Sequence, residues 1–255
     1  MSMILDQFKL DGKVAIVTGV SRGLGQGIAI ALAEAGADIV GAGVSDMSGT
    51  AARIEKLGRR FLPVQVDLKD KASVEKIVSA AKAEFGKINI LVNNAGIITR
   101  NEMLDFTEQE WDDVMDVNLK NLFFLSQAVA NEFVAQGNGG KIIHIASMLS
   151  FQGGIRVASY TASKSGVKGL TMLMTNELAK HNIQVNAIAP GYMATDNTKA
   201  LQEDPERNAS ILARIPAERW GTPQDLAGAV VFLASSASNY VNGHTLAVDG
   251  GWLGR

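Results

Sequence analysis

Short β-branched runs alternate with alanine-rich segments of helical period along nearly all of this 255-residue chain. This pattern predicts strands at 13–18, 38–44, 60–66, 88–93, 141–146, 184–189 and 244–248. The intervening helices are expected at 23–36, 48–58 (capped by Ser48), 71–85, two within 108–136, 158–181 and 223–234. Such alternation predicts parallel strands joined by right-handed crossovers, with helices on both faces of the sheet. We therefore expect one doubly wound α/β domain over residues 1–255.

One segment breaks the strand–helix rhythm. Residues 195–219 are polar and only loosely periodic, and Trp220 follows directly. Because ligands of doubly wound folds bind beyond the carboxyl ends of the strands, this segment is placed to cover a bound substrate. We interpret 195–220 as a possible substrate lid; a fixed pair of surface helices is the alternative.

Composition excludes several classes of protein. The net charge is −2 with no basic block, so nucleic-acid binding has no electrostatic basis. The chain has no cysteine and three histidines, which excludes disulfides and thiolate metal sites and disfavours any metal centre. Its first residues lack the apolar core of a signal peptide, and no apolar run approaches the ~20 residues of a membrane span. We expect a cytoplasmic protein that binds no membrane.

A glycine-rich turn joins the first strand to the first helix. Its spacing is Gly-x-x-x-Gly-x-Gly, which differs from the Gly-x-Gly-x-x-Gly dinucleotide fingerprint. Glycines there let the backbone approach a pyrophosphate, which then meets the positive end of the helix. The residues expected at the nucleotide are Gly19, Ser21, Arg22, Gly23, Leu24 and Gly25. Tight turns also use glycine for local reasons, but the position in a βαβ unit favours nucleotide binding.

Two further segments belong to the nucleotide end. Asp67, followed by Leu68, comes after the third strand and can accept a hydrogen bond from an adenine amino group. The fourth strand ends in Asn93 and then Asn94, Ala95 and Gly96, whose small side chains leave room for a cofactor. Ordinary turn chemistry is the alternative for the two asparagines.

The second strand leaves the cofactor choice open. An acidic residue at its end selects NAD through the ribose, whereas a nearby arginine accommodates the phosphate of NADP. The usual position of this selecting residue falls on Gly43, which is neither an acidic residue nor an arginine. Asp46 lies slightly later and suits NAD, and Arg22 suits NADP.

Tyr160 and Lys164 stand four residues apart within an expected helix, so their side chains share one face. A cation beside a phenol favours the phenolate, and we expect Lys164 to lower the Tyr160 pKa from about 10. Such a tyrosine can exchange protons as a general acid or base. Ser147 lies thirteen residues upstream, at the end of a strand. Taken alone, the pair is more often a surface lysine packed over a tyrosine ring.

The motifs together resemble the short-chain dehydrogenase/reductase family. The glycine turn, Asn93–Gly96, Asn118, Ser147, the Tyr160/Lys164 pair and Pro190-Gly191 occur in that family's order and spacing. The resemblance covers essentially the whole chain. It implies a Rossmann-type sheet of seven parallel strands and a homotetramer.

The resemblance also implies residue roles. Tyr160 would exchange a proton with the substrate oxygen, Ser147 would hold that oxygen, and Lys164 would bind the nicotinamide ribose. Asn118 would fix a water in a proton relay. In the loop after the sixth strand, which Pro190 and Gly191 shape, Met193 and Thr195 would meet the carboxamide. A helix cap is the alternative for Asn118, and a strand-end turn for Ser147.

Three stretches, 136–143, 147–157 and 248–253, resemble family members that oxidise or reduce deoxy sugar acids in pectin and uronate breakdown. That similarity implies NAD as cofactor, with NADP not excluded, and a small sugar acid as substrate. Arginine suits a carboxylate, so we expect Arg156 to bind it, with Gln152 and Tyr192 near hydroxyls. A solvated Arg156 is equally compatible, and Arg100 and Arg214 are weaker candidates.

Another sugar or polyol dehydrogenase of the same family is one alternative, and two further rival functions remain. An NADP-dependent reductase of 3-oxoacyl thioesters on acyl carrier protein would also match the family and Arg22. It should carry a basic docking patch, whereas the lysines and arginines are scattered. A non-catalytic nucleotide sensor would be expected to lack a catalytic residue. The four catalytic candidates, Asn118, Ser147, Tyr160 and Lys164, are all present.

Overall fold

The computed structural model describes residues 3–255. In this range one seven-stranded sheet has all its neighbouring strands parallel, in the order β3-β2-β1-β4-β5-β6-β7. The strands are β1 Val14–Thr18, β2 Asp38–Gly43, β3 Phe61–Gln65, β4 Ile90–Asn93, β5 Gly140–Ile145, β6 Ile183–Pro190 and β7 Thr245–Val248. The predicted fold class and sheet are thus confirmed.

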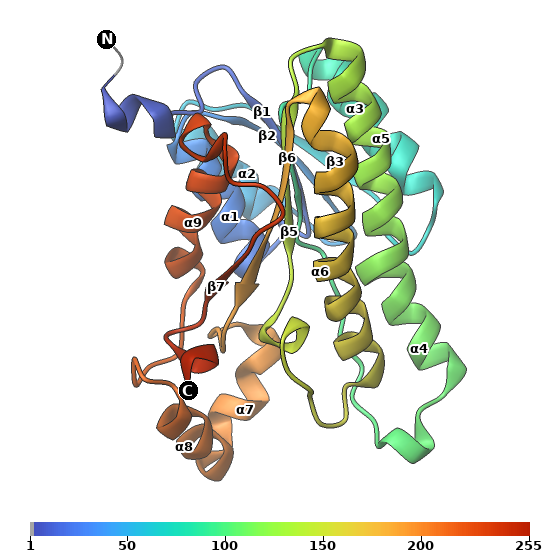
Figure 1. Cartoon of the computed structure of the whole chain (residues 1–255), viewed down its shortest axis with the longest axis vertical. Helices are drawn as coiled ribbons and strands as arrows, with labels where there is room; N and C mark the ends of the chain where they lie inside the picture. Colours follow the sequence, from blue (N-terminus) through green and yellow to red (C-terminus); the bar gives the residue numbers. More distant parts are fainter. Residues whose placement is uncertain (1–2) are drawn as a thin grey trace.

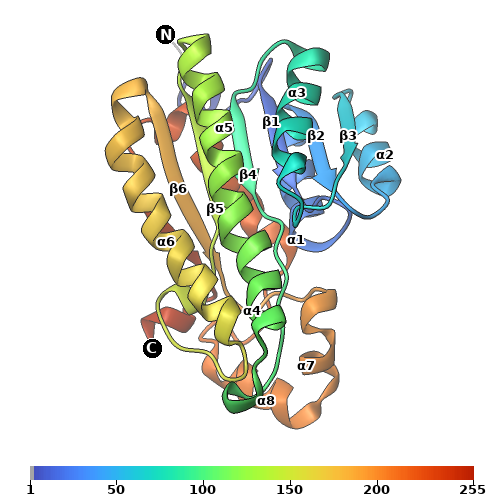
Figure 2. The same ribbon diagram turned by 90° about the vertical axis from the view of Figure 1, so that its right-hand side faces the viewer.

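Helices cover both faces of the sheet (Figures 1 and 2). Helices α1 and α9 pack on one face, and α3, α5 and α6 on the other. The helices are α1 Gly23–Glu34, α2 Ser48–Lys56, α3 Ala72–Phe85, α4 Glu108–Met115, α5 Asn121–Gln136, α6 Ala158–Leu178, α7 Lys199–Glu203, α8 Pro205–Arg214 and α9 Ala227–Ala234.

The central strands explain why the sheet forms. Every residue of β1, β4 and β6 is buried, because helices exclude water from both faces. Ile143 and Ile145 of β5 point to the α1 face, while Ile142 points to the α5 face. Each such side chain contributes roughly 1.5–3 kcal/mol on burial. Continuous apolar runs therefore specify a two-sided core.

The strand order places the ligand site. β1 pairs with β2 on one side and β4 on the other, so the chain reverses its direction of winding between them. Such a switch point leaves a crevice at the carboxyl ends of the strands. In Figure 1 these ends point downward, toward α7 and α8.

Several local expectations need correction. Ser48 begins α2 instead of capping it; Met47 is the cap residue, and the Ser48 hydroxyl bonds the Asp46 carboxylate at 2.5 Å. The two helices expected within 108–136 are confirmed as α4 and α5, and a π turn, Asp116–Lys120, joins them without a break. The helix expected at 223–234 starts with the 3₁₀ turn Pro223–Leu226, because its capping box tightens the first turn.

The segment 195–220 contains α7 and α8, which lie beyond the carboxyl ends of the strands (Figure 2). Whether it moves as a lid stays a prediction. Within residues 3–255 no helix combines the length and apolar character needed to cross a membrane.

Candidate active site

The glycine turn forms a close-packed backbone cradle. Gly19 and Gly23 have φ of +73° and +57°, a conformation that other residues rarely adopt. A Cβ on Gly25 would lie 2.0 Å from the Gly19 carbonyl oxygen. Arg22 is the cap residue of α1 and makes no side-chain cap hydrogen bond, so its side chain leaves the first amides of the helix uncovered. This geometry fits a bound pyrophosphate.

The end of β4 is fastened to the same turn. Asn94 Nδ2 donates to the Thr18 carbonyl oxygen at 2.8 Å, and the Thr18 hydroxyl accepts from the amides of Asn94 and Ala95. A Cβ on Gly96 would lie 3.2 Å from Asn118 Oδ1 and 3.7 Å from Lys164 Nζ. Asn94, Ala95 and Gly96 thus connect the nucleotide cradle with the catalytic side chains.

Asn93 lies elsewhere. It is buried, and its amide nitrogen bonds Ser126 Oγ at 2.9 Å and His144 Nδ1 at 3.1 Å. The turn chemistry suggested for Asn93 does not occur, because its side chain points into the core beneath α5.

Fewer contacts define the region expected to bind adenosine. Asp67 Oδ1 accepts from the Lys69 amide, and the Leu68 carbonyl accepts from Asn121 Nδ2 at 2.6 Å. Asp67 is exposed, so its carboxylate is accessible to a ligand. The loop around Leu68 is held in place from α5.

The two cofactor-selecting candidates are both engaged. The Asp46 carboxylate accepts from the amide and hydroxyl of Ser48, which lowers the Asp46 pKa. Arg22 Nε lies 3.4 Å from Asp196 Oδ2, an exposed pair. A Cβ on Gly43 would meet no close neighbour before the backbone of Gly19. The contacts at the end of β2 therefore do not decide between NAD and NADP.

The four catalytic candidates converge at the carboxyl ends of β4 and β5. Tyr160 and Lys164 share one face of α6, with Lys164 Nζ 5.6 Å from the tyrosine ring centroid. Ser147 lies two residues after the end of β5 and shares a hydrogen bond with Tyr160. Asn118 Nδ2 lies 3.3 Å from Ser163 Oγ on α6. The structure thus brings together all four residues that the motifs singled out.

Asn118 owes its position to the π turn between α4 and α5. It is fully buried, and its amide bonds both backbone groups of Ile97, each at 2.9 Å. Single π turns inside helices are frequent at functional sites because they re-aim one side chain. Asn118 is therefore not a helix cap; it anchors the loop that follows β4.

The electrostatics of the pair differ from the expectation. Burial raises the pKa of Tyr160, opposed by the hydrogen bond with Ser147 and by the charge of Arg100. Burial lowers the pKa of Lys164 to about 8. The predicted lowering of the Tyr160 pKa by Lys164 is wrong for this structure, because the ammonium points to the Ile145 carbonyl oxygen, 2.5 Å away.

The loop after β6 closes the nicotinamide end. Pro190 ends the strand, and a Cβ on Gly191 would lie 2.5 Å from Asp249 Cα. The Met193 carbonyl accepts from the Thr198 hydroxyl at 2.6 Å. The Thr195 methyl would lie 3.8 Å from a Cβ on Gly23. The segment from β6 toward α7 therefore borders the glycine cradle.

The substrate candidates have partners of their own. Arg156 Nε pairs with Glu102 at 2.9 Å, and both side chains are more than half exposed. Gln152 Oε1 accepts from Arg214 and from Trp252 Nε1. The Tyr192 ring packs on Trp220 and Trp252, with centroids 5.5 and 4.8 Å away. Arg156 and Gln152 are therefore favoured as substrate-binding residues only by their position in the loop, since their polar groups already have partners.

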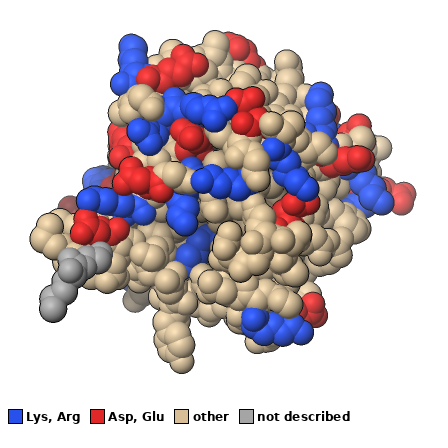
Figure 3. Space-filling model, turned by 90° about the horizontal axis from the view of Figure 1, so that it is seen from above, with Lys and Arg blue, Asp and Glu red and all other residues tan. Residues whose placement is uncertain are grey.

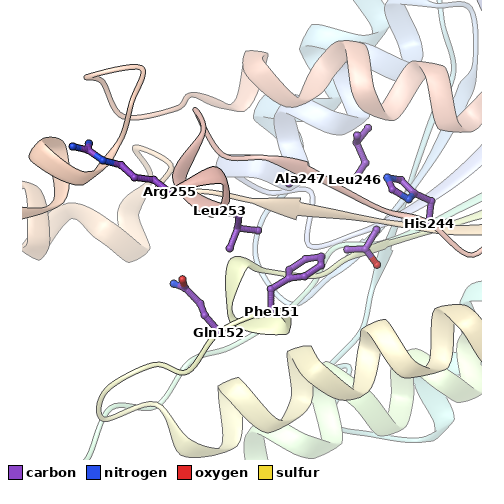
Figure 4. Close-up of a pocket in the computed structure, with 8 residues that line it drawn as sticks. Phe151, Gln152, His244, Leu246, Ala247, Leu253 and Arg255 are labelled. Atoms are coloured by element: carbon purple, nitrogen blue, oxygen red, sulfur yellow. The ribbon is translucent and has the colours of Figure 1, made fainter.

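A surface groove lies beside this region (Figure 4). It runs between Phe151 and Gln152 of the loop after β5 and the strand β7, and Leu253 and Arg255 also line it. None of the four catalytic candidates lines it. Within residues 3–255 no cluster of three histidine, aspartate or glutamate side chains has the geometry to hold a metal ion.

Two backbone groups that hold catalytic side chains belong to none of the sequence motifs. The carbonyl of Ile145 and the backbone of Ile97 hold Lys164 and Asn118. Backbone groups leave no signal in side-chain identity, so no pattern could have found them. Arg100, which the sequence suggested only as a weaker carboxylate candidate, also acts on Tyr160 through its charge.

Comparisons with known proteins agree with this geometry. A family model described as enoyl-(acyl carrier protein) reductase matches residues 19–253. The 2-dehydro-3-deoxy-D-gluconate 5-dehydrogenase of Escherichia coli K12 is 63% identical over 99% of this chain and 100% of its own. The enzyme of that name from Bacillus subtilis 168 is 54% identical, and each chain is covered completely. The chain belongs to the short-chain dehydrogenase/reductase family.

Solved structures of the family share the whole fold. A gluconate 5-dehydrogenase from Burkholderia cenocepacia J2315, in complex with NADP and tartrate, superposes with a TM-score of 0.93 at 40% identity. The match covers 99% of this chain and 100% of that one. As a family member, the chain is an oxidoreductase acting on CH–OH groups.

Proposed function

We propose that this chain is an NAD-dependent dehydrogenase that interconverts the hydroxyl and keto forms of 2-dehydro-3-deoxy-D-gluconate at carbon 5. Full-length identity of 63% to the Escherichia coli enzyme of that activity carries the proposal. The convergence of Asn118, Ser147, Tyr160 and Lys164 supplies the chemical means. The product would be 3-deoxy-D-glycero-2,5-hexodiulosonate.

The protein residues divide the proton chemistry. Tyr160 gives its phenolic proton to the carbonyl oxygen in reduction and takes it back in oxidation, and Ser147 holds that oxygen by a hydrogen bond. The raised Tyr160 pKa keeps the phenol protonated and ready to donate. When bound, the nicotinamide supplies or accepts the hydride.

Lys164 and Asn118 support Tyr160. In our proposal Lys164 exchanges its bond to the Ile145 carbonyl for one to the nicotinamide ribose. Its pKa of about 8 lets the amine pass a proton near neutral pH. Asn118 holds the loop after β4 at Ile97. It would also fix the water at one end of the proton relay to solvent.

The cofactor contacts follow the cradle. The turn from Gly19 to Gly25 would hold the pyrophosphate, and Asp67 and Leu68 would border the adenine. Met193 and Thr195, with Pro190 and Gly191 behind them, would meet the carboxamide. We propose NAD as the preferred cofactor, with NADP not excluded because Arg22 stands beside an open Gly43.

We propose that Ser147, Gln152, Arg156 and Tyr192 border the sugar acid. Gln152 and Arg156 belong to the loop between β5 and α6, and Tyr192 to the loop after β6. These loops lie at the carboxyl ends of the strands, on either side of Tyr160. The segment 195–220 would cover the substrate from the third side.

The assembly and setting complete the proposal. We propose a cytoplasmic homotetramer that acts in pectin or uronate breakdown. Two surfaces suit such an assembly: an apolar groove at α5 and α6, lined by Leu119, Phe123 and Leu173, and the edge strand β7 with its groove (Figure 4). Neither nucleic acid nor membrane is a proposed partner, and on the face in Figure 3 acidic and basic side chains intermingle.

Initial rates of cofactor reduction test the proposal. The purified protein is assayed with NAD and with NADP on a panel of sugar acids, polyols and 3-hydroxyacyl thioesters. We expect turnover of 2-dehydro-3-deoxy-D-gluconate, with a higher kcat/KM for NAD than for NADP. Activity on acyl thioesters with NADP alone would replace the proposed function with that of an acyl carrier protein reductase.

A further inference from the structure

A small apolar cluster lies beyond the carboxyl ends of the strands, apart from the core on the two faces of the sheet. Its members come from the loops after β5 and β6, from α7, α8 and the loop that follows them, and from the C-terminal turn Trp252–Gly254. The buried and partly buried members are Met148, Tyr192, Leu201, Ile211, Ile215, Trp220, Trp252 and Leu253. The cluster therefore joins the loop that carries Ser147 with the segment expected to cover the substrate.

Trp252 contacts three of these parts at once. It is buried, and its ring packs on Tyr192 with centroids 4.8 Å apart. The Arg214 guanidinium of α8 lies over the Trp252 ring, 4.0 Å from its centroid. Trp252 Nε1 donates to Gln152 Oε1 at 3.2 Å. One indole thus connects the loop after β5, the loop after β6 and α8.

Gln152 is held by two donors at the same oxygen. Arg214 Nη2 donates to Gln152 Oε1 at 3.3 Å, beside the bond from Trp252. Indole and guanidinium nitrogens can only donate, so the Gln152 amide must turn its oxygen toward them. Gln152 follows Ser147 by five residues, and its backbone amide bonds the Met148 carbonyl oxygen at 3.2 Å. Trp252 and Arg214 therefore fasten the loop of Ser147 to α8.

The end of the chain also binds the end of α8 through its backbone. The Ala217 amide donates to the Gly250 carbonyl oxygen at 3.0 Å. Arg255 Nη1 donates to the Ala213 carbonyl oxygen at 3.1 Å. Gly250 has a φ of +65°, and a Cβ there would lie 3.0 Å from Ile215 Cγ2. A glycine is therefore needed for the tail to turn against the helix.

α7 is held much less firmly than α8. All five residues of α7 are at least partly exposed. The contacts of the residues just before it are an exposed pair of Arg22 with Asp196 at 3.4 Å and a bond from Arg100 to the Asn197 carbonyl oxygen at 3.4 Å. Exposed pairs of this kind contribute little. The helices are separated at Asp204, which caps α8.

We propose that Trp252 is a positioning residue that clamps α8 and the loop of Ser147 to each other, so that only residues 195–204 open and close over the substrate. The inference rests on the proposed function in the sugar acid used to measure turnover. Trp252 acts through Gln152 and Arg214. The fixed wall that results keeps Ser147 in line with Tyr160, with which it shares a hydrogen bond.

Initial rates test the positioning role. Trp252→Phe keeps a ring beside Tyr192 and Arg214 but loses the hydrogen bond to Gln152. We expect kcat/KM for 2-dehydro-3-deoxy-D-gluconate with NAD to fall about 2- to 10-fold, the usual worth of one such bond. Trp252→Ala opens the cluster, and we expect a fall of about 100-fold because a small displacement misaligns the reacting groups. The matched control Trp111→Phe, at an exposed tryptophan of α4, should keep the wild-type value.

Two readouts separate positioning from a general loss of stability. In a Gln152→Met background, Trp252→Phe should cost little further activity, because both changes remove the same bond. The dissociation constant for NADH, measured by cofactor fluorescence, should stay within about twofold in every variant, since the glycine cradle is untouched. Full additivity of the two substitutions, or a lower thermal midpoint with normal kcat and KM, would overturn the positioning role.

Hydrogen exchange shows which part of the segment moves. Tyr160→Phe is compared free and with NAD and the sugar acid bound, so that turnover does not consume the ligands. We expect the amides of 195–203 to gain protection on binding and those of α8 to be protected in both states. Adding Trp252→Ala should make α8 exchange as fast as α7. If α7 and α8 gained protection together, the whole segment would move as one lid and the clamp would be refuted.

The outcomes also separate this inference from the proposed function. If the wild type oxidises a different substrate, the proposed function is wrong, and the same variants test the clamp on that substrate. If the wild type oxidises the acid while Trp252→Phe keeps full activity and α8 moves with α7, only the clamp is wrong.

Discussion

Two parts of the site are built differently. The wall, made of Asn118, Ser147, Tyr160 and Lys164, performs the chemistry. The rim, which includes Arg22 and Arg156, faces the cofactor and the substrate. Asn118 and Lys164 are buried, and each is fixed by hydrogen bonds to backbone groups of neighbouring strands or loops. Arg156 and Arg22 are exposed, and each is paired with a single surface carboxylate. Buried polar groups without partners are costly, whereas exposed ion pairs contribute little. The wall therefore defines the reaction, and the rim can change to suit the substrate.

The largest effect should come from the wall itself. Tyr160→Phe removes the hydroxyl that exchanges the proton and leaves the ring in place. We expect kcat to fall about 10²- to 10⁴-fold, the usual contribution of a positioned acid or base. The dissociation constant for NADH, measured by fluorescence titration, should stay within about twofold because the cradle is untouched. A variant with near-normal kcat would show that another group supplies the proton.

The second effect concerns a buried histidine behind the wall. Burial, assisted by the charge of Lys164, lowers the pKa of His144 from 6.5 to about 3. Between these values the unfolded chain holds a proton that the folded chain lacks, so stability falls as pH drops from about 6.5 toward 3. In His144→Asn, the slope of unfolding free energy against pH should be shallower by up to about 1.4 kcal/mol per pH unit.

Urea unfolding at several pH values measures this slope. The matched control is His181→Asn, at an exposed histidine, whose slope should follow the wild type. Equal slopes for wild type and His144→Asn would show that His144 takes up a proton in the folded state.

The third prediction concerns the anchor of the loop after β4. Asn118→Ala leaves the amide and carbonyl of Ile97 without their partners. We expect the unfolding free energy to fall by about 1–3 kcal/mol and kcat to fall with it. Since the loop after β4 borders the catalytic side chains, KM for the acid should also rise. A change in stability alone, with normal kcat and KM, would mean that Asn118 only supports the fold.

The smallest effect is expected at the rim. Arg156→Ala breaks an exposed pair with Glu102 and should change the unfolding free energy by less than about 1 kcal/mol. Because Arg156 is already paired with Glu102, KM for the sugar acid should change by no more than a few-fold. A large rise in KM would show that Arg156 leaves Glu102 to bind the substrate carboxylate.

The same contrast explains what could be predicted from sequence. Tyr160 and Lys164 were recognised because helical spacing alone puts them on one face, and the strands because two-sided burial demands apolar runs. The π turn that aims Asn118 at Ile97 left no such signal. Nor did the Ile145 carbonyl, whose bond to Lys164 turns the ammonium from the phenol and reverses the expected Tyr160 pKa shift. Pairings such as Arg156 with Glu102 depend on loops whose paths no periodicity fixes.

Isotope transfer shows whether hydride moves directly between carbon 5 of the sugar acid and the nicotinamide. The enzyme is given NAD and 2-dehydro-3-deoxy-D-gluconate labelled with deuterium at carbon 5, and the reduced cofactor is analysed by mass spectrometry. We expect the label to move to the nicotinamide in wild type and Tyr160→Phe to slow its transfer by the same factor as kcat. Reduced cofactor without the label would contradict direct hydride transfer from carbon 5 of a sugar acid.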